Sequence, residues 1–338
     1  MNKEFHYYIT GIVAHAAGFD EDEARTIAEA SQMVDDNDVK FNIEDRATDE
    51  SYEVYISQTM NILKPKRKLM RIYPVFHFLP GEPDCDGACR GDGKMHLLNT
   101  TPNSECANEL MECAFKATAD VRLHRIGVAT HAFADTWAHQ NFVGWFDYFN
   151  NIGLDPKPDI GHADAEHSPD WVSHRWEDDR LVDTFVDNNE RFMEAAEALY
   201  DLYASHINAQ KRQVNMPWDD LRPKLLEAMG PSRSGFENRG QDVRKANYLK
   251  MAQWMGEFDE DEWFKAAFET EVRGLPDCQK GLASTFCIIK DRYFWREDVA
   301  KEETDWFRFQ EAVKAHQKDA MTLIRPRFDK MGVDLRKA

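Results

Sequence analysis

The chain has 338 residues, of which 42% are hydrophobic and 30% are charged, so it can form one large domain or two smaller ones with a substantial core. No apolar run approaches the roughly 18 residues that a membrane-spanning helix needs, and no secretory signal peptide is recognisable, which favours a cytoplasmic protein. The formal net charge of -19 disfavours a long nucleic acid as partner, because most of the surface would repel it.

The N-terminal part of the chain begins with helical patterns and then becomes irregular. A first helix is expected over about residues 4–18, and a second after Asp20, which has Glu23 at the spacing of a capping box. This second helix ends in VDDND, so an acidic pair falls at its C-terminal end. The segments SYEVYI and LMRIYPVFHFLP, within residues 40–80, predict extended structure or a short hairpin.

The rest of the chain is mainly helical between two loops. The loops are expected over residues 81–103, where Gly, Asp and Pro are frequent, and over residues 150–178. Helical spacing of apolar residues predicts helices from Asn103 or Ser104, over 120–143, beyond about 180, and near 217–229, 241–256, 259–272 and 299–324. The pattern as a whole predicts a mainly α fold.

Histidine is concentrated in residues 124–174, which hold six of the twelve. The segment THAFADTWAHQNF places His131, Asp135 and His139 four residues apart, within about 80° of one face of a helix. His131 and His139 would lie about 12 Å apart along the axis, too far for one ion, so the spacing predicts two ions with Asp135 between them. A core histidine with a hydrogen-bond partner is the alternative for each imidazole alone, but a buried Asp without a compensating charge is costly.

Further candidate ligands lie elsewhere in the chain. The segment GHADAEHSPD offers His162 and Glu166 at the four-residue spacing of a helical turn, with an exposed acidic loop as the alternative. Asp35, Asp36 and His77 are weaker candidates, since an Asp pair is often a solvated helix end and a His among aromatic residues is often core. Mixed His and carboxylate ligands suit zinc, with manganese or iron as alternatives.

The whole pattern resembles the zinc-dependent phospholipase C and single-strand nuclease superfamily. The resemblance rests on a helical His-x3-Asp followed by His, a later His-x3-Glu, an upstream Asp and His, and a His near the N-terminus. The phrases FHYYITG, SQMVDDN, FHFLPG and THAFADTWAHQNF also look like a bacterial group of proteins related to that fold. The resemblance covers about residues 1–175. It implies a multi-helix bundle with a tri-zinc cluster at its end, here with an irregular or short β insertion near 40–100 and extra C-terminal helices.

The resemblance also implies a role for each candidate ligand. One zinc would be held by Asp35 or Asp36, His77, His131 and Asp135, a second by His139, His162 and Glu166, and a third by Asp135 and His6. In the secreted relatives a processed N-terminal amine is also a ligand. Because no signal peptide is recognisable here, we expect His6 in its place.

These expectations lead to a functional hypothesis. Two or three zinc ions would activate a water and neutralise a phosphate ester, while Asp36 or Asp164 positions the water or protonates the leaving group. We expect a metal-dependent phosphoesterase acting on a small phosphate ester or a lipid head group. A non-catalytic protein with a structural metal cluster is the alternative. An HD-type phosphohydrolase is disfavoured because the chain has no adjacent His–Asp pair. Residues 1–178 would form the metal-binding core and residues 179–338 a helical region packed on it.

Overall fold

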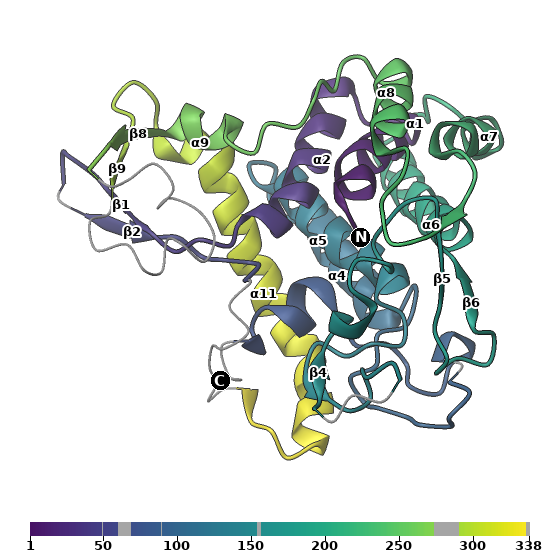
Figure 1. Ribbon diagram of the computed structural model, residues 1–338. Coiled ribbons are helices and arrows are strands. Elements are labelled where there is room, and N and C mark those ends of the chain that lie inside the picture. The colour runs from purple at the N-terminus through teal and green to yellow at the C-terminus, as the bar shows by residue number, and fades with distance from the viewer. Residues whose placement is uncertain (49, 60–68, 89, 154–156, 274–290, 336–338) are drawn as a thin grey trace.

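The computed structural model describes residues 1–48, 50–59, 69–88, 90–153, 157–273 and 291–335 (Figure 1). The α-helices are α1 (Thr10–Ala16), α2 (Glu21–Asp36), α4 (Glu105–Phe115), α5 (Arg122–Ala138), α6 (Asn188–Ala209), α7 (Trp218–Met229), α8 (Gln241–Met251), α9 (Glu262–Ala267) and α11 (Asp305–Lys330). The π-helices are η1 (Glu4–Ile9) and η2 (Tyr73–His77), and short 3-10 turns are η3 (Asp86–Ala88), η4 (Ala163–Ala165) and η6 (Lys301–Glu303). The strands are β1 (Asn42–Glu44), β2 (Ser51–Glu53), β3 (Phe146–Asp147), β4 (Asp159–Ile160), β5 (His174–Glu177), β6 (Phe185–Asp187), β7 (Arg233–Ser234), β8 (Phe268–Glu271) and β9 (Arg292–Trp295).

Helix α5 is the centre of the helical part, and every residue from His124 to Ala138 is buried. Helices α2, α4, α6 and α11 pack around it (Figure 1). The contact with α2 is close because α5 has a glycine there: a Cβ on Gly127 would come within 2.5 Å of the Ala30 Cβ. This approach brings the C-terminal end of α2 beside the face of α5 that carries His131 and Asp135.

The beginning of α2 follows the sequence expectation. The Asp20 carboxylate accepts the Glu23 amide at 2.8 Å, and the Glu23 carboxylate accepts the Asp20 amide at 2.9 Å, which completes the capping box. The helix ends at Asp36, so the acidic pair lies at its C-terminal end as expected.

The second of the two expected extended segments is helical instead. Residues 73–77 of LMRIYPVFHFLP form the π-helix η2, with Pro74 in its first turn, where a missing amide proton costs nothing. Helix η2 packs on α5 and α11 and ends at His77. Because π-helices are rare and frequent at functional sites, the two that carry His6 and His77 direct attention to these side chains.

In the part of the chain that the structure describes, three small sheets accompany the helices. The largest has the order β2-β1-β9-β8 and lies at one end of the molecule, on the left in Figure 1. In it β1 pairs antiparallel with β2 and parallel with β9, where Ile43 lies opposite Tyr293. The other two sheets have the orders β6-β5-β7 and β3-β4.

These sheets correct the expected fold, a mainly α bundle of the phospholipase C type with β structure confined to residues 40–100. About 50% of the structure is helix and 10% is strand, and of the nine strands in the described residues seven, β3 to β9, lie beyond residue 100. The expected helix at 259–272 ends at Ala267 and continues directly as β8, and β6 precedes α6 in the stretch after residue 180. Strands of two to four residues depend on partners remote in sequence, which local periodicity does not detect.

The sequence predicts no membrane-spanning helix, and the helices of the structure were compared with this prediction. Within the described ranges, none combines the length and the apolar character needed to cross a bilayer.

Candidate metal centre

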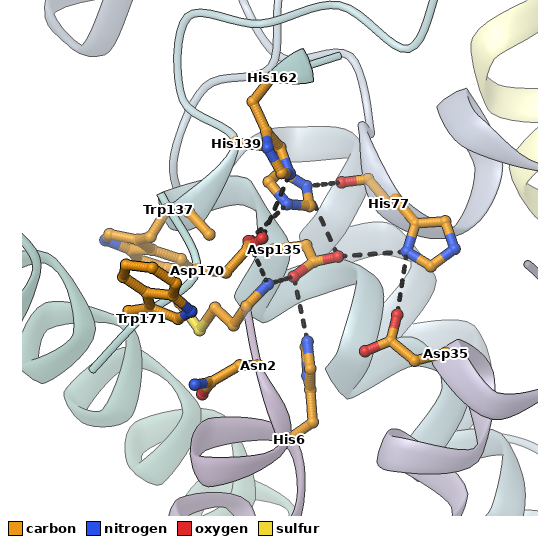
Figure 2. Close-up of polar contacts among 12 residues, drawn as sticks. Asn2, His6, Asp35, His77, Asp135, Trp137, His139, His162, Asp170 and Trp171 are labelled. Carbon is orange, nitrogen blue, oxygen red and sulfur yellow. Dashed lines mark hydrogen bonds and ion pairs between the residues drawn. The ribbon is translucent and has the colours of Figure 1, made fainter. Parts of the chain in front are cut away.

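Asp135, on α5, is the point on which several side chains converge (Figure 2). Its carboxylate is only 1% exposed. The Oδ2 atom lies 3.2 Å from His131 Nε2, 3.4 Å from His77 Nδ1 and 3.6 Å from His139 Nδ1. The Oδ1 atom lies 3.2 Å from His6 Nε2. One carboxylate thus joins imidazoles from three separate segments of the chain.

Asp35 completes a first group of ligand atoms around His77 and His131. Its Oδ1 atom lies 3.8 Å from His77 Nδ1 and 3.7 Å from His131 Nε2. Two overlapping sets of donor atoms are close enough to hold an ion here, His77 with His131 and Asp135, and His6 with Asp35 and His131.

A second group lies at the end of α5 and in the loop that follows. His139 Nε2 is 3.2 Å from Asp170 Oδ1, and His162 Nε2 is 3.4 Å from Asp170 Oδ2. These three side chains form a separate set with ion-binding spacing. Figure 2 shows the set adjoining Asp135, so the two groups are neighbours.

Hydrogen bonds to backbone carbonyls determine which ring nitrogen faces the first group. His131 Nδ1 lies 2.8 Å from the Ser31 oxygen, and His77 Nε2 lies 3.1 Å from the Ser57 oxygen. A carbonyl can only accept, so each of these nitrogens donates its proton. The remaining nitrogens, His131 Nε2 and His77 Nδ1, are 3.1 Å apart, and in the neutral rings both present lone pairs. Two lone pairs at this distance repel unless a proton or a cation lies between them.

The second group has the same arrangement. His139 Nδ1 donates to the His77 oxygen at 2.6 Å, and His162 Nδ1 donates to the Glu166 oxygen at 2.7 Å. Both rings therefore turn Nε2 toward the Asp170 carboxylate. Orienting hydrogen bonds of this kind, from the nitrogen opposite the metal, accompany nearly all histidine metal ligands.

The His6 ring approaches Asp135 Oδ1 at 3.2 Å but makes no hydrogen bond of good geometry in the described structure. It is fully buried, stacks on His131 with ring centroids 3.8 Å apart, and neither of its nitrogens has a hydrogen-bond partner there. Burial, together with repulsion from His131 and the Met1 amine, lowers the pKa of His6 to about 4, so the ring is neutral. A neutral, buried imidazole beside a carboxylate fits a cation ligand.

The ionisation of the carboxylates also favours a bound cation. Burial alone would raise the pKa of Asp135, but the neighbouring imidazoles and the Met1 amine lower it well below its usual range. The pKa of Asp170 is lowered in the same way, against burial, chiefly by His162 and the amine. The buried Asp135 and half-buried Asp170 carboxylates therefore stay ionised and require positive charge nearby.

The Met1 α-amino group supplies part of this charge in the structure. It contacts Asp135 Oδ1 and lies 3.3 Å from Asp170 Oδ1. Burial would lower the pKa of the amine, but attraction to Asp135, Asp170 and Asp35 raises it to about 10. His6 was expected in place of an N-terminal amine, whereas the structure brings both to Asp135.

A cavity of about 550 Å³ opens onto this centre. Candidate ligands from both groups line it, together with the aromatic side chains of Tyr73, Phe78 and Trp171. The centre is thus both buried among the helices and reachable by a small molecule.

Seven of the eight predicted ligands come together in these two groups: His6, Asp35, His77, His131, Asp135, His139 and His162. Glu166 does not join them through its carboxylate. Its side chain is exposed at the cavity wall, its carbonyl orients His162, and its backbone has a φ of 50°. The segment forms a 3-10 turn, η4, rather than an α-helix, so the expected i, i+4 geometry is not realised.

Asp170 takes the position that was expected for Glu166. It belongs to the same GHADAEHSPD segment but lies eight residues after His162, a spacing that favours no common ligand geometry. The sequence indicated only that this segment contains several acidic residues. Which of their side chains points toward the histidines depends on the tertiary fold.

The two predicted catalytic carboxylates lie outside these groups. Asp36 accepts a hydrogen bond from Gln32 at 3.0 Å and lines a different cavity of about 370 Å³, where burial raises its pKa to about 6. Asp164 accepts the Ile152 amide at 2.9 Å and lines a third hollow of about 680 Å³. Neither belongs to the groups of ligand atoms or lines the cavity of the metal centre, so the geometry gives no support to their expected catalytic roles. Asp35 lines both its own centre and the cavity of Asp36, and it is the member of the acidic pair that reaches the histidines.

Comparison with known proteins gives a family without an assigned activity. The profile of the family of unknown function DUF6765 matches residues 1–324, so the chain belongs to that family. No curated protein and no solved structure matches the chain.

Proposed function

We propose that this member of the DUF6765 family is a metal-dependent hydrolase of phosphate esters that binds two or three divalent cations. Zinc is the preferred candidate. The observation that carries the proposal is the facing of His77 Nδ1 and His131 Nε2 at 3.1 Å, each with its other nitrogen donating to a carbonyl. A cation between them would remove the repulsion of their lone pairs and compensate the charge of Asp135. Manganese and iron remain alternatives to zinc, since both accept imidazole and carboxylate ligands.

Two neighbouring groups of ligands support hydrolysis. Divalent cations held close together would activate a water and neutralise the oxygens of a phosphate group. The residues then have distinct roles: Asp135 belongs to the first group and adjoins the second, while His139, His162 and Asp170 form the second. This likeness of ligand types and order to the zinc-dependent phospholipase C and nuclease superfamily concerns the site alone and not the fold.

Glu166 replaces Asp36 and Asp164 as the candidate for proton transfer. Its exposed carboxylate lines the cavity, and within the described structure it makes no contact with a ligand histidine. A carboxylate in this position can orient a water or protonate a leaving group. The proposed substrates are small phosphate esters or lipid head groups in the cytoplasm, because the net charge of -19 disfavours long nucleic acids.

A non-catalytic metal cluster is the second candidate. It is favoured by the depth of the site, since His6 and His131 are fully buried and Asp135 is 1% exposed. In that case the ions would stabilise the junction of the five chain segments that carry the ligands, without turnover.

The test combines metal analysis with turnover of a panel of phosphomonoesters and phosphodiesters. We expect at least two metal equivalents per chain, loss of hydrolysis on chelation and its recovery on adding zinc. The variant Glu166→Gln should keep its metal and lose at least about 100-fold in kcat, the usual range for a general acid or base. Fewer than two equivalents would contradict the proposed centre, and full occupancy without turnover on the panel would favour the structural cluster.

A further inference from the structure

Lys3 is the one lysine or arginine among the described residues that line the metal cavity. Four carboxylates line the same cavity, those of Asp35, Asp135, Glu166 and Asp170. A basic side chain in such an acidic cavity would ordinarily pair with one of them. Lys3 forms no ion pair with any residue in the described part of the chain, and its ammonium instead lies 4.8 Å from the centroid of the Phe258 ring.

The backbone around Lys3 is firmly held. Glu4, the next residue, is fully buried and pairs with Arg244 through contacts of 2.7 and 2.8 Å. The Asn2 carbonyl accepts the amides of Phe5 and His6 at 3.0 and 3.1 Å. Lys3 therefore has a fixed starting point at the cavity wall, and the face of Phe258 limits where its half-buried side chain can turn.

The charge of the loaded site indicates what Lys3 is for. Two divalent cations would balance the four carboxylates that line the cavity, and the ammonium groups of Lys3 and of the Met1 N-terminus would then remain as uncompensated positive charge. A ligand that fills the cavity has to be anionic for this charge to be paired. A phosphate monoester has a second ionisation with a pKa near 6, so at neutral pH it carries more negative charge than a diester.

We propose that Lys3 selects phosphate groups that carry a second negative charge, by pairing its ammonium with an anionic oxygen that the metal ions leave free. This inference rests on the proposed function for the presence of the metal ions, and it adds a preference for phosphomonoesters over diesters. The alternative is a purely structural role, in which the aliphatic part of the Lys3 side chain covers the Phe258 ring. The variant Lys3→Met keeps an unbranched stem over the ring without the charge, and Lys3→Arg keeps the charge.

The experiment measures the binding of two probes to the metal-loaded protein by calorimetry at about pH 8. Inorganic phosphate is the dianionic probe, and dimethyl phosphate is the singly charged one. We expect Lys3→Met to bind phosphate roughly 3- to 5-fold more weakly, as for the loss of one partly exposed ion pair, and dimethyl phosphate within about twofold of wild type. Lys3→Arg should bind both as wild type does. The loss in Lys3→Met should shrink at high salt, because salt screens the pair.

Several outcomes would overturn the proposal for Lys3. They are equal binding of phosphate by wild type and Lys3→Met, an equal loss for both probes, and no binding of either probe by the metal-loaded wild type. Metal content and melting temperature of each variant show that the centre and the fold are intact. Binding and turnover also separate the two proposals. Selective phosphate binding without hydrolysis of any ester supports Lys3 and contradicts the hydrolase. Hydrolysis of a phosphomonoester with the same kcat/KM in wild type and Lys3→Met overturns only the role of Lys3.

Discussion

Asp135 and Asp170 differ in how many ligand atoms depend on them. Asp135 faces the nitrogens of His6, His77 and His131 and also lies 3.6 Å from His139, whereas Asp170 faces only His139 and His162 among the histidines. Removing the Asp135 charge should therefore disturb the whole centre, and removing that of Asp170 should disturb one position.

We expect Asp135→Asn to lose more than one metal equivalent and Asp170→Asn to lose about one. The measurement is elemental analysis after gel filtration without free metal. Asp164→Asn serves as the matched control, because Asp164 accepts a backbone amide outside the centre, and its metal content should be unchanged. Equal losses from Asp135→Asn and Asp170→Asn would contradict the central position of Asp135.

The two halves of the ligand set were predictable to different degrees for a physical reason. His131, Asp135 and His139 could be assigned from spacing because they lie along α5 or at its end, where four residues make about one turn. His162 and Glu166 have the same spacing in a segment that turns as η4, so the rule pointed to the wrong acid. Asp170 reaches the centre through the course of a loop, which spacing does not encode.

At the scale of elements, α11 supports the π-helix that presents His77. His316, on α11, is fully buried, donates from Nε2 to the Val75 carbonyl at 3.1 Å and stacks on Phe76 with centroids 5.3 Å apart. Its Nδ1 atom has no hydrogen-bond partner in the described structure. A buried, neutral imidazole therefore lies directly behind the ligand-bearing turn.

The protonation of His316 should make the fold sensitive to acid. Burial, and then repulsion from Arg125, lowers the pKa of His316 from 6.5 to about 3. The unfolded chain thus binds this proton first, so the histidine has no effect above about pH 6.5 and reduces the free energy of unfolding as the pH falls toward 3. The slope in this window is at most about 1.4 kcal/mol per pH unit.

The variant His316→Gln should remove this sensitivity, since an amide can still donate to the Val75 carbonyl and does not titrate. Urea unfolding of the chelated protein at pH 7.5 and 5 provides the measurement. We expect wild type to lose roughly 2 kcal/mol more than His316→Gln between these values. Identical losses in the two proteins would show that His316 is not the group responsible.

Elements with their own local signal were easier to predict than those that need a remote partner. Helix α2 begins with a capping box, and α4 begins at the expected Ser104, whose hydroxyl accepts the Ala107 amide at 3.3 Å. Strand β1, by contrast, has three residues and pairs with β9, where Ile43 lies opposite Tyr293, 250 positions later, so nothing in its own sequence specifies the sheet. The mistaken expectation of a bundle with one local β insertion follows from this difference.

At the scale of the whole molecule, the C-terminal half holds the N-terminal segment against the metal centre. Helix α8 contributes Arg244 to the buried pair with Glu4, two residues before His6, and the Tyr7 hydroxyl donates to the Met255 carbonyl at 2.8 Å. Helices α6 and α11 pack on α5 itself. The residues beyond 179, which carry no recognisable motif, are thus part of the structure that positions the ligands.

The pair of Glu4 and Arg244 provides the test of this role. Both side chains are almost fully buried, so Arg244→Met would leave the Glu4 charge without its partner, and we expect a loss of about 3–5 kcal/mol in the free energy of unfolding. The double variant Glu4→Gln with Arg244→Met should recover part of this loss, because the isolated charge is gone. Arg239→Met is the matched control: Arg239 pairs with Glu237 at the surface, with both side chains more than 60% exposed, and its loss should cost less than about 1 kcal/mol. If Arg244→Met unfolds at the same urea concentration as Arg239→Met, the buried pair does not fasten the N-terminal segment, and the C-terminal half does not position His6 through it.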